Sequence, residues 1–327
     1  MTKSPQHPAS RFDSGKGPAH IRLSAPAKIN LYLEVLGRRE DGFHELITVL
    51  QTIDLADVIE LRVREREPAI PVGRADVCFE LSGDSGAITA AVEGEDQGRN
   101  NAGRVPDGAE NLAARAAIAW LHAAGKQDEV GIDLRLQKNI PAGAGLGGGS
   151  SDAATVLRGL DQLLGHSEGP ALAPLAAKLG SDVAFFLVGG TALCTGRGEN
   201  VIPLAEPDPF DLVLGFPDFT IPTPAVYAAL NAPALTRAAS PPHELQKAWA
   251  NRLAGATPSD LEQFFQNDLE SPACSVRPEL VDLLAPLDTH LSGSGSTLFL
   301  YGSDTPTTRP ACRRTLMRFA RHRSRKR

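Results

Sequence analysis

The chain has 327 residues and a formal net charge of −6, and 42% of its residues are hydrophobic, which is enough for two domains with sizeable cores. No uninterrupted apolar run approaches the ~18 residues of a membrane span, so we expect no membrane partner. The cysteines show no C-x-x-C pair and no metal-ligand spacing, which indicates buried thiols in a reducing cytoplasm and no metal site: Cys78, Cys194, Cys274 and Cys312.

Strand-like sequence dominates the N-terminal part of the chain. Residues 1–19 are polar and rich in Pro, Ser and Gly, which predicts a disordered tail without the apolar segment of a secretory signal. Alternating apolar residues predict strands over 20–35, 43–61 (broken near Asp54 and Asp57) and 77–81. Residues 65–109 are rich in Gly, Asp and Asn and are interpreted as an elaborated hairpin or insertion. A helix is expected over 109–124, ended by Gly125.

Helices become more frequent in the second half. Further strands are expected over 130–136, 191–194 and 211–215, and a glycine turn over 291–301 leads into another. Helices are expected over 153–164, 171–179, 222–254 (interrupted by prolines), 260–267 and 278–284. This alternation is too irregular for a doubly wound sheet, so the predicted fold class is α+β in two domains.

Basic residues are concentrated at the C-terminus. From Arg313 onward there are eight Lys or Arg and no acid, so the rest of the chain carries a charge of −14. A basic run can bind RNA or anionic lipid, but such a run is more often a solvated tail, and we favour the tail. Because the body is acidic, we do not expect nucleic acid as the main partner.

The most informative segment is a glycine-rich loop at residues 141–151, Pro-Ala-Gly-Ala-Gly-Leu-Gly-Gly-Gly-Ser-Ser. Five of the seven residues from 143 to 149 are glycine, so the backbone can approach a ligand closely. An apolar helical pattern begins directly behind it. Free N–H groups and the helix dipole at such a junction favour an anion, which predicts a site for a nucleotide or another phosphate.

Three other interpretations of this loop fit less well. Flexible linkers usually have more polar flanks, whereas this loop is framed by a strand and a helix. A Walker A loop requires Lys-Ser/Thr after its last glycine, and none follows Gly149. Gly143, Gly145 and Gly148 match the dinucleotide pattern G-x-G-x-x-G, but a helical stretch at 171–179 replaces the required second strand.

Three short segments place polar residues in apolar surroundings. Lys28 and Asn30 lie on one face of the first strand, which alone would indicate an exposed strand face. Asp182 is flanked by apolar residues, and alone it could be a helix N-cap. Phe43 and His44 follow a tight turn, where a histidine alone would be an ordinary surface residue.

Together with the glycine loop, these segments resemble the GHMP kinase superfamily and, within it, the 4-diphosphocytidyl-2-C-methylerythritol kinases of non-mevalonate isoprenoid synthesis. The matching segments occur in family order and extend from about residue 21 to 302: 25–31, 37–45, 109–113, 140–154, 179–186, 221–226 and 292–299. The combination of Asp-Gly-Phe-His with Gly-Leu-Gly-Gly-Gly-Ser-Ser-Asp-Ala-Ala is specific to this group.

The resemblance implies a two-domain α+β GHMP kinase fold, with a ribosomal S5 domain 2-like N-terminal domain and a ferredoxin-like C-terminal domain. We expect these domains at residues 20–205 and 206–312, followed by a basic tail at 313–327. The implied reaction is ATP-dependent phosphorylation of the 2-hydroxyl of a cytidyl diphosphate sugar alcohol. Mg²⁺ would be carried by the nucleotide, and the enzyme would be a monomer or homodimer.

The resemblance also implies roles for individual residues. The ATP phosphates would be bound by the main chain of Pro141, Ala142, Gly143, Ala144, Gly145, Leu146, Gly147, Gly148, Gly149, Ser150 and Ser151, with Asn111 near the adenine. Asp182 would accept the proton of the attacking hydroxyl, with Lys28 beside it. The substrate would be bound by Phe43 on the cytosine face, His44 at the cytosine edge, and Asn30 and Lys138 at its hydroxyls or phosphates.

The chain departs from the family pattern in three places, and two rival functions stay open. The region at residues 65–109 is longer than the family pattern. Ala184 stands where the family usually has proline, and the Arg-rich C-terminus stands where the family has a last strand, so we expect the second sheet to lack that strand. One rival is a kinase for another alcohol, such as homoserine or mevalonate, which Phe43 and His44 disfavour. The other is a non-catalytic RNA-binding protein on the same fold that uses the basic tail.

Overall fold

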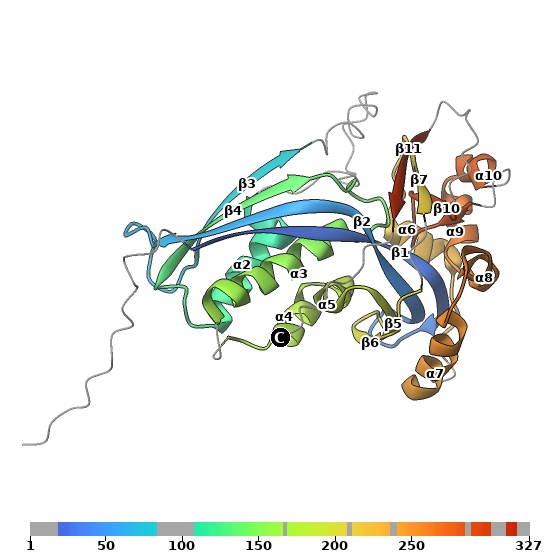
Figure 1. Ribbon diagram of the computed structural model, residues 1–327, viewed down its shortest axis with the longest axis horizontal. Coiled ribbons are helices and arrows are strands. Elements are labelled where there is room, and N and C mark those ends of the chain that lie inside the picture. The colour runs from blue at the N-terminus through green and yellow to red at the C-terminus, as the bar shows by residue number, and fades with distance from the viewer. Residues whose placement is uncertain are drawn as a thin grey trace, which may run out of the picture.

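Two long antiparallel strands form the spine of the protein in a computed structural model, which describes residues 19–83, 108–165, 169–207, 211–235, 241–284, 289–301 and, for the backbone only, 312–318. The strands are β1 (His20–Arg38) and β2 (His44–Glu65), paired from His20 opposite Arg62 to Arg38 opposite His44 (Figure 1). The break predicted in β2 near Asp54 and Asp57 is an irregularity within one continuous strand, because the register with β1 shifts between Thr52 and Ala56. The strand continues but changes its second neighbour there, from β5 (Thr191–Gly196) to β4 (Val130–Lys138).

The larger sheet has seven strands in the order β3-β4-β2-β1-β8, with β5 on β2 and β6 on β5. Its remaining strands are β3 (Asp76–Gly83), β6 (Asn200–Pro203) and β8 (Gln266–Asn267). The sequence analysis predicted β3 but neither β6 nor β8, which replaces the end of a predicted helix. The β3–β4 and β1–β8 pairs are parallel and the others are antiparallel.

Four helices cover one face of this sheet (Figure 1). They are α2 (Leu112–Ala123), α3 (Gly148–Leu160), α4 (Leu172–Leu179) and α5 (Ser181–Val188), with a 3₁₀ turn at Gly108–Glu110 and a π-helical turn at Asp161–Gly165. Trp120, Leu134, Leu157 and Phe185 are fully buried in the shared core. Burial of this apolar face is the main term that stabilises the layer.

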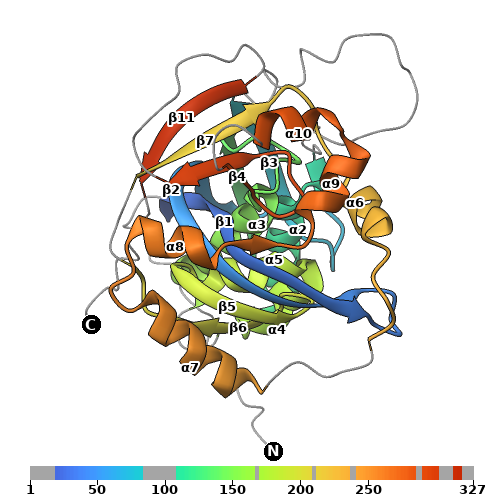
Figure 2. The ribbon, with the colours of Figure 1, turned by 90° about the vertical axis from the view of Figure 1, so that its right-hand side faces the viewer.

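A second, antiparallel sheet lies at one end of the spine, in the order β11-β7-β10-β9 (Figure 2). Its strands are β7 (Asp211–Pro217), β9 (His290–Leu291), β10 (Leu298–Tyr301) and β11 (Cys312–Arg318). The accompanying helices are α6 (Thr223–Leu230), α7 (Pro242–Leu253), α8 (Pro258–Phe264), α9 (Glu270–Val276) and α10 (Glu279–Leu284). The α+β class is confirmed, whereas the division at residues 205 and 206 stays a prediction.

The expectation that this sheet lacks its last strand is wrong. Residues 312–318, which include the first six residues of the predicted basic tail, form β11 along β7 from Cys312 opposite Pro217 to Arg318 opposite Asp211. Strand pairing uses backbone donors and acceptors, which basic side chains do not remove, and charged residues are common on edge strands. Residues 1–18, residues 319–327 and most of the predicted insertion lie outside the described residues. Within the described ranges, no helix is long and apolar enough to cross a membrane.

Candidate active site

A cleft of about 780 Å³ opens between the glycine-rich loop, the β1–β2 hairpin, the β5–β6 turn, helix α6 and the β9–β10 turn. It collects residues from segments far apart in the sequence, including Lys28, Asn30, Phe43, His44, Thr48, Gly145, Gly147, Asp182, Arg197, Tyr227, Gly293 and Ser294. The structure therefore brings together five of the predicted site residues outside the loop, Lys28, Asn30, Phe43, His44 and Asp182. From the loop, Gly145 and Gly147 line the same cleft.

The glycine-rich loop has the backbone geometry of an anion site. Gly143, Gly145 and Gly147 have φ of +67°, +77° and +68°, angles that L side chains rarely adopt. Gly147 is the N-cap of α3 and makes no side-chain cap hydrogen bond. The first N–H groups of the helix therefore remain available to donate to a ligand. A Cβ on Gly149 would meet no atom within 4 Å, so space lies open beside the helix start.

The loop is fastened from two directions. The Lys28 N–H of β1 donates to the Leu146 carbonyl (3.0 Å). From the β9–β10 turn, the Ser292 hydroxyl donates to the Gly145 carbonyl (3.0 Å) and the Thr297 N–H donates to the Ala144 carbonyl (3.1 Å). A side chain on Gly145 would overlap the Ser292 carbonyl oxygen, so the loop and this turn fit only because Gly145 has none.

Lys28 and Asp182 face the cleft beside this loop. Lys28 is 5% exposed, and its Nζ donates to Asn30 Oδ1 at 2.8 Å, as expected for two residues on one strand face. Burial lowers the pKa of Lys28, while the Asp182 carboxylate and the Cys194 thiol act in the opposite direction. Asp182 is in the first turn of α5, whose N-cap is Gly180, so the N-cap interpretation of Asp182 is wrong.

Aromatic residues line the other end of the cleft. Phe43 is 51% exposed, and the Arg197 guanidinium carbon lies 4.7 Å from the centre of its ring. The His44 ring stacks on Tyr227 with centroids 4.7 Å apart and planes 28° apart. Burial and the nearby positive charge of Arg38 lower the pKa of His44, which favours the uncharged ring at neutral pH.

Sequence reasoning missed Tyr227 and Arg197. Tyr227 directly follows a segment of the family resemblance, and on α6 its ring turns to the cleft. Burial raises the pKa of Tyr227 to about 12, with a smaller effect from Asp182, so it stays a neutral phenol. Arg197 is on the tight turn between β5 and β6, where no pattern in the sequence marks it.

Lys138 and Asn111 are not among the residues that line the cleft. Lys138 is 3% exposed, and its Nζ forms ion pairs with the carboxylates of Asp57 and, at 2.8 Å, Asp152. Asp57 also accepts the N–H groups of Asn139 and Ile140, directly before the loop. Lys138 thus supports the loop from beneath. Asn111 is buried as the N-cap of α2, where its Oδ1 accepts the Ala113 N–H (2.9 Å).

The Lys138 cluster consists of the buried Lys138 ammonium group and the buried carboxylates of Asp57 and Asp152. Burial raises the pKa of Asp152 to about 7, Lys138 opposes that rise, and the Asp57 carboxylate adds to it. Burial alone would lower the pKa of Lys138, but the two carboxylates outweigh burial and raise it. An acid inside an apolar strand pattern, as at Asp57, was the available sequence signal for this cluster.

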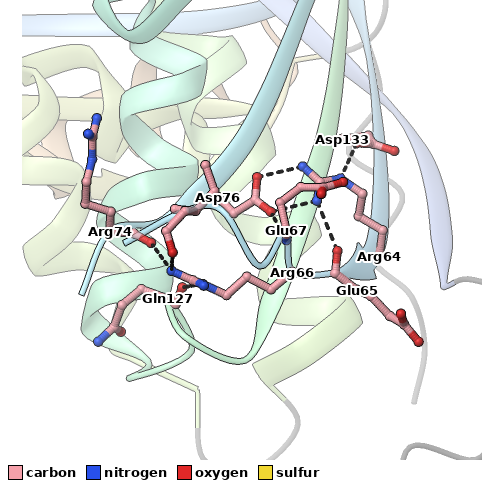
Figure 3. Close-up of polar contacts among 9 residues, drawn as sticks. Arg64, Glu65, Arg66, Glu67, Arg74, Asp76, Gln127 and Asp133 are labelled. Carbon is pink, nitrogen blue, oxygen red and sulfur yellow. Dashed lines mark hydrogen bonds and ion pairs between the residues drawn. The ribbon is translucent and has the colours of Figure 1, made fainter. Parts of the chain in front are cut away.

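A second polar cluster lies near Glu65, the last residue of β2, far along this strand from the cleft (Figure 3). The Arg64 guanidinium binds both oxygens of Asp76 (2.7 Å each) and one oxygen of Asp133 (2.7 Å). Arg66 donates to the carbonyls of Ile70 (2.8 Å) and Pro71 (2.7 Å). These contacts close the β2–β3 loop. Across the described part of the chain, no group of three or more His, Cys, Asp or Glu side chains is placed to hold a metal ion.

Comparisons with known proteins agree with this geometry. The GHMP kinases N terminal domain family matches residues 111–190. The chain is 37% identical to 4-diphosphocytidyl-2-C-methyl-D-erythritol kinase of Heliobacterium modesticaldum over 88% of each chain. It is 38% identical to the enzyme of the same name from Nocardia farcinica, over 86% of this chain and 84% of the relative.

Solved structures include one of the same enzyme and others that share only the fold. A crystal structure of 4-(cytidine 5'-diphospho)-2C-methyl-D-erythritol kinase is 35% identical, covers 92% of this chain and all of its own, and superimposes with a TM-score of 0.63. A homoserine kinase from Cytophaga hutchinsonii shares the fold at 18% identity, with 95% and 97% of the two chains covered and a TM-score of 0.57.

Proposed function

The chain belongs to the 4-diphosphocytidyl-2-C-methyl-D-erythritol kinase family, and on that premise we propose that it transfers the γ-phosphoryl group of ATP to the 2-hydroxyl of 4-diphosphocytidyl-2-C-methyl-D-erythritol. The observation that carries the proposal is the set of groups that line one cleft. An anion-binding loop, a carboxylate beside a buried lysine, and an aromatic end for a base all line it.

ATP is proposed to bind with its phosphates on the N–H groups of residues 141–151. The uncapped start of α3 and the positive end of its dipole favour phosphate there. Mg²⁺ is proposed to accompany the nucleotide, where it would neutralise the negative charge that develops on the phosphates during transfer. Asn111 near the adenine stays a prediction.

Asp182 is proposed as the group that accepts the proton of the substrate hydroxyl. A positioned base of this kind contributes ~10²–10⁴ in rate. The buried Lys28 interacts electrostatically with this carboxylate and brings a positive charge to the site of transfer. The same charge would stabilise the negative transition state, which is the larger part of catalysis in this chemistry.

The aromatic end is proposed to bind the cytosine. Phe43 offers a half-exposed ring face, and uncharged His44 can exchange hydrogen bonds with the edge of a neutral base. Tyr227, stacked on His44, orients that ring. Asn30, hydrogen-bonded to Lys28, lies at the alcohol end and would contact the substrate hydroxyls. We assign no substrate contact to Lys138.

We also propose that the enzyme works in the cytoplasm. Cys78, Cys194 and Cys274 are free thiols, which suits a reducing compartment.

A turnover assay with ATP, Mg²⁺ and a panel of alcohols tests the function. We expect phosphoryl transfer to the cytidyl diphosphate substrate and at least about 10²-fold lower kcat/KM for homoserine and mevalonate, which lack a base for the aromatic end. Preference for homoserine or mevalonate would favour another GHMP-type kinase. RNA binding that weakens with salt, without any ATP turnover, would favour the non-catalytic alternative.

A further inference from the structure

The proposed substrate carries a diphosphate between its base and its alcohol, and this linker needs a cationic partner. Among the residues that the structure describes, three Lys or Arg line the cleft: Lys28, Arg38 and Arg197. Lys28 is buried at the alcohol end and donates to Asn30. Arg38 is beside His44 at the base end, where its charge lowers the pKa of that histidine. Arg197 is the residue whose contacts reach both ends.

The backbone of Arg197 lies at the catalytic end. Its neighbour in the β5–β6 turn, Gly198, is so close to α5 that a Cβ there would be 3.8 Å from both Asp182 Oδ1 and Ser181 Cβ. The guanidinium group, in contrast, extends to the base end, 4.7 Å from the centre of the Phe43 ring. A linker that joins a base on Phe43 to an alcohol at Asp182 therefore has to pass this side chain.

The guanidinium is also prepared to bind phosphate. When a guanidinium packs over an aromatic ring, its N–H donors stay at the edge of the group. They are therefore available to bind two oxygens of a phosphate. Within the described residues, the acid paired with it is Glu199 at 3.8 Å, longer than a hydrogen bond, and Glu199 Oε2 already accepts the Arg197 backbone N–H (2.5 Å). The side chain is 31% exposed, so a ligand can reach it.

We propose that Arg197 binds the diphosphate of the substrate and selects for nucleoside diphosphate-linked alcohols over alcohols without this linker. This assignment rests on the proposed function. It makes Arg197 a specificity-determining residue that holds the linker while Phe43 and Asp182 engage the two ends. Because the cation also covers one face of Phe43, the cytosine would use the other face.

Binding of cytidine and of cytidine diphosphate to the full-length protein tests the proposal by calorimetry, without turnover. We expect Arg197→Ala to weaken cytidine diphosphate binding about 10- to 100-fold, the range for a lost hydrogen bond to a charged group, and to change cytidine binding less than about twofold. Arg197→Lys keeps the positive charge but loses the two parallel N–H donors of the guanidinium. Its affinity for cytidine diphosphate should lie between those of the wild type and Arg197→Ala. KM for the complete substrate should rise by a similar factor while KM for ATP stays constant.

Arg252→Ala is the matched control. The Arg252 guanidinium packs over Trp249 at 4.8 Å, the same type of contact, but Arg252 is not among the cleft-lining residues. We expect unchanged binding of both ligands. Equal weakening of cytidine and cytidine diphosphate by Arg197→Ala would overturn the proposal, because Arg197 would then act only by supporting Phe43. Unchanged diphosphate binding would overturn it too. A wild-type protein that does not phosphorylate the cytidyl substrate would instead refute the proposed function itself.

Discussion

At the residue scale, one buried lysine organises the catalytic end of the cleft. Lys28 Nζ donates to Asn30 Oδ1, Asn30 Nδ2 donates to Thr48 Oγ1 (3.0 Å), and the Thr48 hydroxyl donates to the Tyr32 carbonyl (2.6 Å). These hydrogen bonds fix the ammonium group through neutral partners, and no carboxylate among the described residues is hydrogen-bonded to it directly. Its charge remains available to Asp182 and to the transferred phosphoryl group.

Asp182→Asn should lower kcat at least ~10²-fold, because the amide keeps the shape of the side chain but cannot accept the hydroxyl proton. ATP affinity should change little, since the proposed phosphate contacts come from the main chain of the loop. Steady-state kinetics combined with equilibrium nucleotide binding would separate these effects. Turnover close to that of the wild type would exclude Asp182 as the base.

At the element scale, the glycine-rich loop and α3 are held in place from both sides. The β9–β10 turn binds the Gly145 and Ala144 carbonyls, and beneath the loop Asp57 and Lys138 connect β2, β4 and α3. The uncapped donors of α3 are therefore presented by a backbone that neighbouring elements hold rigidly. Such preorganisation lowers the entropic cost of binding a flexible triphosphate.

Two glycines of this loop provide a matched comparison. Gly145→Ala should weaken ATP binding at least about tenfold and reduce stability, because the residue has φ of +77° and its Cβ would overlap the Ser292 carbonyl. Gly149→Ala should be tolerated structurally, because its Cβ would meet no atom within 4 Å. Nucleotide binding and thermal unfolding of both variants provide the measurement. Equal effects at the two positions would contradict the described loop geometry.

The Lys138 cluster predicts a specific pH dependence. Because burial raises the pKa of Asp152 to about 7 from its usual value near 4, the folded protein binds a proton there that the unfolded chain releases between these pH values. The stabilisation from this proton is complete below about pH 4 and is lost as the pH rises through about 7.

Asp152→Asn should remove this contribution, because the amide oxygen can still accept a hydrogen bond from Lys138 but does not titrate. The free energy of unfolding of the wild type, relative to the variant, should therefore decrease from pH 4.5 to pH 8, as measured by urea denaturation at a series of pH values. A constant difference between the two proteins would mean that Asp152 stays ionised throughout this range.

At the scale of the whole molecule, the site exists because two sheets share one core. Ile29 of β1, Leu193 of β5, Leu214 of β7 and Phe299 of β10 are buried in the same cluster. Asn267 of β8 strengthens this junction by donating to the carbonyls of Leu291 and Gly293 (2.8 Å each). The turn that supports the glycine loop is thereby held against β1, the strand that carries Lys28.

Deletion of residues 312–327 should lower the midpoint of thermal unfolding by more than about 4 °C, because it removes β11 and leaves the edge of β7 unpaired. The double substitution Arg313→Gln and Arg314→Gln is the control, since it removes charge but keeps the backbone of the strand. We expect a change of less than about 2 °C for it, measured by calorimetry. A deletion variant with the same unfolding midpoint as the wild type would show that β11 does not stabilise the sheet.

The sequence alone determined the features that depend on local pattern. Alternating apolar residues identified β1, β3, β4 and most of β2, and the density of glycine in the loop identified an anion site. The motifs around Lys28, Phe43 and Asp182 identified the family, because phosphoryl-transfer chemistry requires particular residue types at particular places.

Only the tertiary structure decided the features that depend on long-range partners. The sequence predicts Lys138 as a substrate ligand, but in the structure it is buried beneath the loop, paired with Asp57 of β2 and Asp152 of α3. Strand β11 forms because β7 offers an open edge, which the basic composition of its sequence does not reveal. Arg197 gained a proposed role through its position between Phe43 and Asp182. Pairing and burial are set by residues that are close in space and not in sequence, so no local pattern encodes them.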